Sequence, residues 1–374
     1  MKLMHLSDLH LGKTICGYPM LKDQEYILER ILEIVRAQIP EAIMIAGDVF
    51  DRSAPSAETV ALMDDFLTKL AAFNIPILMI AGNHDSPERI AYGGRIMEHC
   101  GIYLSPVYDG TVKSVRLSDE HGEVCFWLLP FLHPWDVRMH YPEIKPNAND
   151  ALRTVIDSME LDGSVRNVLI AHQFVAGMSV AGSEETYCGT AEQVSAEVFA
   201  PFEYTALGHL HNPKNVGSPR IRYCGTPLKY SISEANSNKT VTIVELGEKG
   251  CEPVITEIPL KPKRDMKKLY GSFDELMRGT DEDYVHVLLT DPTDVTDAMG
   301  KLRMRYPFIL GMDYARNKTV TPDVLESLQR EPEQEPEELF SAFFEKMLSI
   351  KMNTQQTQII HDLVESIWKK EENA

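Results

Sequence analysis

The sequence lacks the features that are typical of membrane-spanning, secreted and disulfide-bonded proteins. Its 374 residues contain no apolar run near the ~18 residues that suggest a membrane span. The opening residues, MKLMHLSDLH, lack the long apolar segment of a secretion signal. The six cysteines are scattered and form no CxxC pair, which argues against a thiolate zinc site and a disulfide framework. We therefore expect a cytoplasmic protein with no membrane partner.

Positive charge is also scarce, since 37 basic residues face 56 acidic ones and the formal net charge is -19. Nonspecific DNA affinity comes mainly from Lys and Arg, so net charge alone argues against a DNA enzyme. The distribution is uneven, however: residues 323–374 hold 12 acidic and 5 basic side chains, whereas KPKRDMKK at 261–268 holds five basic ones. Bound divalent metals would also reverse the local field at a carboxylate site. Net charge therefore does not decide whether the protein acts on DNA.

The first half of the chain alternates apolar runs with helical patterns. The runs KLMHLS, AIMIA and IPILMIA predict strands, and segments 21–38 and 56–73 between them predict helices. Short predicted strands continue to about residue 258. The pattern predicts an α/β fold of two packed sheets covered by helices, within a domain over residues 1–260. Ligands of such sheets gather at the carboxyl ends of the strands.

The second part of the chain has a different pattern. EIPLKPKRDMKK at 257–268 predicts a linker, followed by a small α+β unit over 266–322 with a helix at 294–305. LQREPEQEPEE predicts a flexible acidic linker. Apolar stripes then predict a pair of amphipathic helices within residues 337–372, which either bind a partner or fold back on the chain. The first alternative is favoured because a flexible tether precedes them.

Potential metal ligands follow five separate predicted strands. HLSDLH, IAGDVFDR, IAGNHD, IAHQF and LGHLH each end an apolar run with carboxylate, amide or imidazole groups. One histidine after a strand is usually structural, but five coincident strand ends favour a shared site. The candidate ligands are Asp8, His10, Asp48, Asn83, His172, His209 and His211.

These ligands carry oxygen and nitrogen without sulfur. Seven are too many for one zinc ion, but they suit two divalent ions bridged by one carboxylate. The mixture of oxygen and imidazole favours Mn²⁺ or Fe²⁺ over Mg²⁺, with Zn²⁺ as an alternative. Such a pair hydrolyses phosphate esters. The GNHD turn fits this site, with Gly82 expected to bend the chain out of the sheet.

The order D-x-H, GD, GNH, H, GHxH resembles that of the calcineurin-like metallophosphoesterases. Over nearly the whole chain the resemblance is closer to one branch, the SbcD nuclease subunits, because GTPLKYSISEA at 225–235 and SEETYCGT at 183–190 are similar to segments of that branch. The resemblance implies a double-sheet sandwich flanked by helices, an α+β DNA-capping domain at 266–322, and a C-terminal helix pair that binds the SbcC ATPase.

The resemblance also implies roles for the site residues. One ion would be held by Asp8, His10, Asp48 and His211, and the other by Asp48, Asn83, His172 and His209, with Asp48 as the bridge. His84 would face the scissile phosphate, where it stabilises the transition state or protonates the leaving oxygen. Asp85 is expected to orient His84 or its loop. Asp51 stands where archaeal and eukaryotic relatives carry a second catalytic histidine, and is counted with the catalytic positions.

The function implied by the resemblance is a Mn²⁺-dependent DNA nuclease subunit that acts in DNA repair, recombination and replication. It would be a 3′–5′ exonuclease on duplex ends and an endonuclease on single strands or hairpins, and it would form a homodimer. ATP would act through the SbcC-type partner, since this chain has no GxxxxGK[ST] loop.

Two other functions remain in view. A protein phosphatase or small phosphodiesterase of the same fold is one, because GDVFDR resembles the phosphatase GDxVDRG motif, although Ser53 replaces its final glycine. The other is a DNA-end scaffold with a decayed metal site, against which the complete ligand set argues. Outside the site, we expect His5 in the core and the basic run 261–268 either on DNA or in solvent. The remaining histidines, expected to be structural or exposed, are His99, His121, His133, His140, His286 and His361.

Overall fold

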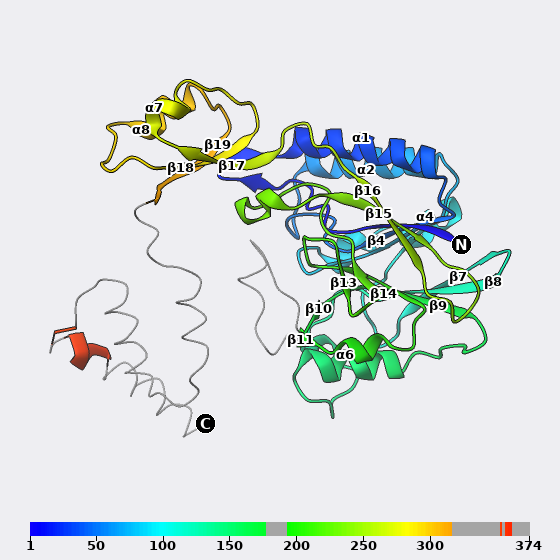
Figure 1. Cartoon of the computed structure of the whole chain (residues 1–374). Helices are drawn as coiled ribbons and strands as arrows, with labels where there is room; N and C mark the ends of the chain where they lie inside the picture. The colour runs from blue at the N-terminus through cyan, green and yellow to red at the C-terminus, as the bar shows by residue number, and fades with distance from the viewer. Residues whose placement is uncertain (177–192, 316–351, 354–355, 361–374) are drawn as a thin grey trace. The chain divides into compact units, whose positions relative to one another are not determined.

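A computed structural model of the chain describes residues 1–176, 193–315, 352–353 and 356–360 (Figure 1). The chain divides into two units, Met1–Asp313 and Tyr314–Ala374. The elements below belong to the first unit, apart from the last residue of its final strand. Within the ranges given, no helix combines the length and the apolarity that crossing a membrane requires.

The first sheet of the sandwich has six strands in the order β16-β15-β1-β4-β5-β6. Strands β1, β4, β5 and β6 are parallel, and β15 pairs antiparallel with β1 and β16. The strands are β1 (Lys2–Leu6), β4 (Ala42–Ala46), β5 (Ile77–Ile80), β6 (Ile102–Leu104), β15 (Thr240–Glu245) and β16 (Val254–Pro259). Helices α1 (Leu21–Gln38) and α2 (Ala57–Ala71) connect the parallel strands and lie together on one side of the sheet (Figure 1).

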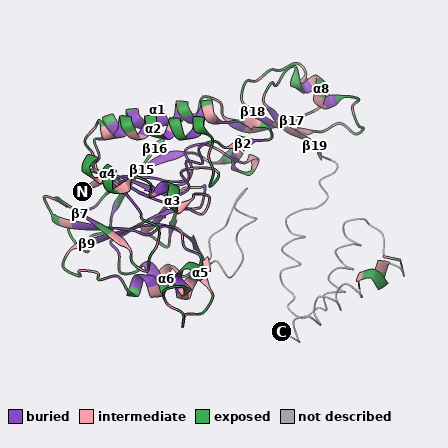
Figure 2. Ribbon diagram, turned by 180° about the vertical axis from the view of Figure 1, so that it is seen from behind, coloured by how far each residue is buried: buried purple, intermediate pink, exposed green. Residues whose placement is uncertain are grey.

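The second sheet also has six strands, in the order β13-β14-β12-β9-β8-β7. They are β7 (Lys113–Asp119), β8 (Gly122–Leu128), β9 (Arg166–His172), β12 (Tyr204–Gly208), β13 (Lys214–Val216) and β14 (Ser218–Tyr223). Helices α5 (Pro134–Arg138) and α6 (Ala148–Asp157) cover its outer face (Figure 2). The central strand sequences are almost wholly apolar because both faces of each sheet are buried.

The two sheets share a core of interdigitated side chains, including Leu3, Met44, Phe126, Ile170 and Tyr204, all fully buried. A separate apolar cluster fills the space between the first sheet and its helices, and another lies between the second sheet and α6. The resulting order of layers is helix, sheet, sheet, helix. The predicted double-sheet α/β sandwich flanked by helices is confirmed.

Several short elements were not predicted, because two to five residues are too few to show a period. They are β2 (Thr14–Ile15), β3 (Tyr18–Pro19), α3 (Pro87–Ile90), α4 (Gly94–Met97), η1 (Glu98–Cys100), β10 (Phe174–Val175), β11 (Gln193–Val194), η4 (Ala196–Phe199) and η5 (Ile232–Asn236).

A small three-stranded sheet follows, in the order β17-β18-β19. It consists of β17 (Met266–Gly271), β18 (Tyr284–Leu289) and β19 (Ile309–Tyr314), with helices α7 (Phe273–Leu276) and α8 (Ala298–Arg303). The predicted linker at 257–268 is too long, since β16 ends at Pro259 and β17 begins at Met266. The predicted helix at 294–305 is also too long. Asp297 has a φ of 53°, and this left-handed residue separates α8 from the residues before it.

The boundaries of the small unit, 266–322, and of the C-terminal segment, 337–372, stay predictions. Of the C-terminal segment the structure describes residues 352–353 and 356–360, and the latter five are helical. His361 lies outside the described residues, as does the segment SEETYCGT.

A buried carboxylate on α1 joins the small sheet to the sandwich. Asp23 accepts hydrogen bonds from Nη1 of Arg264, at 3.1 Å from each carboxylate oxygen, and from the Tyr284 hydroxyl at 3.0 Å. The Arg264 guanidinium also lies 4.3 Å from the centre of the Phe308 ring. Asp23 is 2% exposed, so both partners would lose a desolvated acceptor without it.

We expect Asp23→Ala to loosen the small sheet, because a buried pair that loses one partner leaves the other group unsatisfied. Opening of β18, measured by amide hydrogen exchange, should become easier by about 2–4 kcal/mol. Lys267→Ala is the matched control, since Lys267 pairs with Asp281 and Asp283 near the surface and should cost no more than about 1 kcal/mol. Equal exchange in the two variants would contradict the expected role of Asp23.

Candidate metal centre

The loops that leave the parallel strands have unusual backbone conformations. Asp8, His10, Asp48 and His209 all have positive φ, at 51°, 43°, 49° and 100°, although few residues other than glycine adopt such angles. The loops hold one another in place: the Asp8 amide donates to the Gly47 carbonyl at 3.0 Å, and the His10 amide donates to the Asp48 carbonyl at 2.9 Å. Such conformations persist where surrounding contacts determine them, often at functional sites.

These loops bring all seven predicted ligands together. On one side, Asp8, His10 and His211 offer ligand atoms that lie within 4.8 Å of one another. On the other side, Oδ1 of Asn83 lies 3.0 Å from Nε2 of His172 and 3.2 Å from Nδ1 of His209.

Asp48 lies between the two groups. Its Oδ2 is 3.6 Å from Nε2 of His10 and 3.4 Å from Nε2 of His172. Metal–ligand bonds of about 2.1 Å place neighbouring ligand atoms about 3 Å apart, which is close to these separations. The donor set therefore fits divalent ions, and Asp48 is the residue that faces both groups of donors.

His10 provides a second test of the fit. Both of its ring nitrogens are buried and have no hydrogen-bond partner among the residues that the structure describes. Such a group costs free energy unless another partner satisfies it. The nearest carboxylates, Asp48 and Asp51, lie at 3.6 and 3.7 Å, beyond hydrogen-bonding distance. A cation bound at Nε2 would supply the missing partner.

Burial dominates the electrostatics of the site. It raises the pKa of Asp8 and lowers the pKa of His209 to about 3 and that of His10 well below its usual value. Burial likewise opposes charge on His172, but the carboxylates of Asp48 and Asp8 outweigh it and raise the pKa of His172 to about 9. Imidazoles surround the buried carboxylates of Asp8 and Asp48. Divalent ions would balance this charge.

Two imidazoles are oriented by acceptors that sequence patterns did not reveal. Nδ1 of His172 lies 2.8 Å from the Ala46 carbonyl oxygen, and Nδ1 of His211 lies 3.1 Å from Oε1 of Glu234. Because both acceptors bind a proton on Nδ1, Nε2 is left to face the site. The only sequence signal for Glu234 was its place in GTPLKYSISEA. The Ala46 acceptor is a backbone carbonyl, which no side-chain pattern can reveal.

His84 lies at the margin of the site. Its side chain is 26% exposed, against 3% for Asp48, and its Nε2 lies 4.0 Å from Oδ2 of Asp48. Nδ1 is 3.1 Å from the Asp51 carbonyl oxygen, and the His84 amide donates to Oδ1 of Asp48 at 2.9 Å. A carbonyl oxygen can only accept a hydrogen bond, so Nδ1 of His84 carries a proton. Nε2 of His84 does not face this carbonyl.

Asp51 and Asp85 have different surroundings. The Asp51 carboxylate accepts from Nζ of Lys13 at 2.7 Å and lies 3.7 Å from Nδ1 of His10. The Asp85 carboxylate accepts from three backbone amides, those of Val49, Phe50 and Gly82, at 2.9–3.1 Å. Asp85 therefore joins the backbones of two site loops. Burial, with the charge of Asp48, raises the pKa of Asp85 to about 6.

The glycine of GNHD has a different task from the one expected. Gly82 is not among the residues with positive φ, so the left-handed conformation open to glycine is not what this position requires. A Cβ at this position would lie 2.1 Å from Oδ1 of Asp48 and 2.3 Å from its amide nitrogen. Gly208, before His209, is similar, since a Cβ there would lie 1.9 Å from the Ala46 carbonyl oxygen. Both glycines give neighbouring loops the space to approach.

The histidines outside the site lie as expected where the structure describes them. His5 is fully buried, and its Nδ1 lies 2.9 Å from the Tyr204 hydroxyl. Burial lowers the pKa of His5 to about 3. The others contribute to none of the clusters that could hold a metal among the described residues; His99, His121, His133 and His140 are exposed, and His286 is partly buried.

The fold and the centre together define a metal-dependent phosphoesterase. In agreement, the model of the calcineurin-like phosphoesterase family matches residues 1–213. A second model, described as the type 5 capsule protein repressor C-terminal domain, matches residues 262–347.

The SbcD subunit of the SbcCD nuclease of Staphylococcus epidermidis is 33% identical over 322 residues, which cover 83% of this chain and 85% of that protein. The chain therefore belongs to the calcineurin-like phosphoesterases, within the SbcD family, and is a hydrolase of phosphate esters.

Solved structures show more distant likenesses. A dimetal phosphatase from Danio rerio is 10% identical, covers 70% of this chain and 99% of its own, and has a TM-score of 0.40. The phosphoesterase Yfce from E. coli is 14% identical, covers 70% of this chain and 100% of its own, and has a TM-score of 0.29. Scores this low add nothing to the site.

We expect Gly82→Ala to disrupt the centre, because the added methyl group must displace the Asp48 carboxylate or its backbone. Overpacking of this kind costs about 1–3 kcal/mol, and metal content per chain should fall. Thermal unfolding and elemental analysis measure the two effects. Gly163→Ala is the control, since a Cβ there meets nothing within 4 Å and should change stability by no more than about 0.5 kcal/mol. Full metal content in Gly82→Ala would refute the steric argument.

Proposed function

We propose that this chain is the nuclease subunit of an SbcCD-type complex and hydrolyses phosphodiester bonds in DNA. The main support is the convergence of seven oxygen and nitrogen ligands from five strand ends, in a chain whose relative is named a nuclease subunit. Asp8, His10, Asp48 and His211 would hold one ion and Asp48, Asn83, His172 and His209 the other. Two bound ions would polarise the phosphate and activate a water, and the mixed donor set favours Mn²⁺.

His84 is the residue that we assign to the leaving group. Its side chain is 26% exposed, and its Nδ1 proton is held by the Asp51 carbonyl. Nε2 can then turn toward a phosphate, and in the imidazolium form it donates a proton to the leaving oxygen or a hydrogen bond to the phosphoryl group. Asp51 and Asp85 support this geometry as positioning residues, Asp51 through its carbonyl and Asp85 through the loops.

The finer activity is proposed from the family. We propose 3′–5′ exonuclease action on duplex ends and endonuclease action on single strands or hairpins, in DNA repair, recombination and replication. An SbcC-type coiled-coil ATPase would bind residues 337–372 and make cleavage depend on ATP, the small unit at 266–322 would cap the DNA, and the chain would act as a homodimer. The five cysteines that the structure describes are free thiols, as is usual in the cytoplasm.

A protein phosphatase or small phosphodiesterase with the same centre is the second candidate, favoured by the GDVFDR motif. The match of the second family model to residues 262–347 is unexplained by that alternative. Purified protein should therefore be offered linear duplex and hairpin DNA, with and without the ATPase partner and ATP, beside a phosphoprotein and bis(p-nitrophenyl) phosphate. Cleavage of the last two substrates without any DNA cleavage would favour the second candidate.

In the same assay, we expect Asp48→Ala to abolish DNA cleavage with Mn²⁺, because both ions lose the bridge. His84→Ala should retain bound metal and lower the cleavage rate by about 10²–10⁴-fold, the usual contribution of a positioned acid. His121→Ala, at an exposed histidine outside the centre, is the control. Cleavage that is unchanged in Asp48→Ala or His84→Ala would overturn the proposal.

The basic run 261–268 can now be divided. Arg264 pairs with Asp23, and Lys267 pairs with Asp281 and Asp283. Lys261, Lys263 and Lys268 are exposed and form no ion pair with the residues that the structure describes. We propose that these three lysines contact the DNA backbone.

Replacement of all three by glutamine should weaken DNA binding and reduce the slope of log K against log salt by up to about 0.9 for each lost contact. Fluorescence anisotropy with a labelled duplex measures both effects. Lys249→Gln, which changes a lysine at a distant strand connection, is the control. An unchanged slope would mean that the run is solvated linker charge.

A further inference from the structure

Glu234 is a buried carboxylate beside the centre that has no role in the function proposed above. It is 1% exposed and sits in η5. Oε1 lies 3.1 Å from Nδ1 of His211, and Oε2 accepts from Nζ of Lys239 at 2.6 Å. The same Nζ donates to the His211 carbonyl oxygen at 2.8 Å. Glu234 and Lys239 therefore hold both the ring and the backbone of one candidate ligand.

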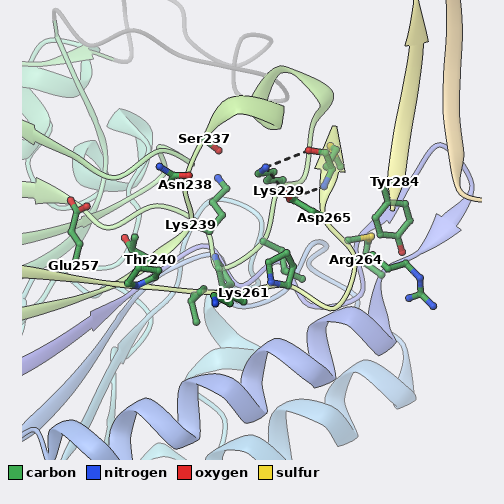
Figure 3. A pocket seen from close by; sticks show the side chains of 17 residues that line it. Lys229, Ser237, Asn238, Lys239, Thr240, Glu257, Lys261, Arg264, Asp265 and Tyr284 are labelled. Carbon is green, nitrogen blue, oxygen red and sulfur yellow. Dashed lines mark hydrogen bonds and ion pairs between the residues drawn. The ribbon is translucent and has the colours of Figure 1, made fainter. Parts of the chain in front are cut away.

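Stability alone is a weak explanation for this arrangement. A buried ion pair gains little net stability, because removing both charges from water offsets most of their attraction. Lys239 is 5% exposed and, with Tyr284 of the small sheet, lines a cavity of about 500 Å³ (Figure 3). Its Nζ donates to Oε2 of Glu234. The pair does orient the His211 ring. An acceptor beside Nδ1 fixes the ring and leaves Nε2 for a metal.

A second lysine that lines the same cavity, Lys229, also holds the segment that carries Glu234. Nζ of Lys229 donates to the Ala235 carbonyl at 2.7 Å and to the Met266 carbonyl at 3.3 Å. It also pairs with Asp265 at 2.9 Å (Figure 3). Ala235 follows Glu234 directly, and Met266 begins β17. Lys229 therefore connects η5 to β17, the first strand of the small sheet. Because η5 also carries Glu234, it connects β17 to His211.

We propose that Glu234 is a positioning residue for His211, neutralised by Lys239, and that through η5 it sets the affinity of one of the two metal ions. The inference rests on the proposed function only in taking His211 as a metal ligand. It requires no DNA cleavage and no partner.

Two double variants test the proposed role of Glu234. Each removes the charges of Glu234 and Lys239 together, so that no unpaired charge is left buried. Glu234→Gln with Lys239→Met keeps a neutral acceptor for Nδ1 of His211, whereas Glu234→Leu with Lys239→Met removes it. Mn²⁺ binding, measured by electron paramagnetic resonance, should show two ions in both variants. In the leucine variant one of them should bind about 10–100-fold more weakly, as is usual when the partner of a metal-bound histidine is lost. The glutamine variant should stay close to the wild type.

A matched control removes a surface ion pair with the same substitutions. Arg116→Met with Glu123→Leu removes an exposed pair on β7 and β8 and should leave both affinities unchanged. Equal binding of both ions in the leucine and glutamine variants would overturn the proposal. So would equal weakening of both ions in the leucine variant, since only one site contains His211.

A measurement on the unaltered chain covers the case in which the leucine variant does not fold. In Zn²⁺-loaded protein, long-range ¹H–¹⁵N spectra should show the proton of His211 on Nδ1, with its signal assigned from His211→Gln. A proton on Nε2 would overturn the proposal. Because neither measurement uses DNA, a chain that binds two ions in this way but cleaves no DNA would refute the nuclease function alone.

Discussion

The position of the Asp48 carboxylate is the constraint on which the rest of the centre depends. One oxygen lies between the imidazoles of His10 and His172, and the other accepts the amide of His84. A carboxylate can face both ways only if the surrounding backbone approaches it closely. That approach explains the residues with positive φ at the strand ends and the absence of a side chain at Gly82.

The residues around this carboxylate form two layers, an inner one of candidate ligands and an outer one of hydrogen-bond acceptors. The candidate ligand atoms face the site, and a surrounding layer of acceptors fixes their orientation: the Ala46 carbonyl for His172 and Glu234 for His211. Asp85 belongs to the same layer and binds backbone amides. Because each of these acceptors is buried, a small displacement of one would be transmitted to a ligand.

The small sheet is joined to this layer at two places. Arg264 and Tyr284 meet Asp23 on α1, and Lys229 joins β17 to η5. Next to Asp23 on the same helix, Gln24 donates to the His10 carbonyl at 2.7 Å. Each connection is therefore one residue and one further hydrogen bond away from a candidate ligand, His10 through Gln24 and His211 through Glu234. A unit proposed to cap the DNA is thus in mechanical contact with the loops that would hold the metals.

Sequence patterns were enough to predict the sandwich and the meeting of the seven candidate ligands, because apolar strands of a parallel sheet end at one edge and polar residues placed there must meet. That these residues bind metal stays a prediction. They could not supply Glu234, the Ala46 carbonyl or the amide partners of Asp85, since contacts such as the first two join loops 23 and 126 residues apart and leave no period or motif. Gly82 shows the division most clearly. Its place in a turn was predictable, but its reason, the space occupied by a carboxylate from another strand, exists only once the chain has folded.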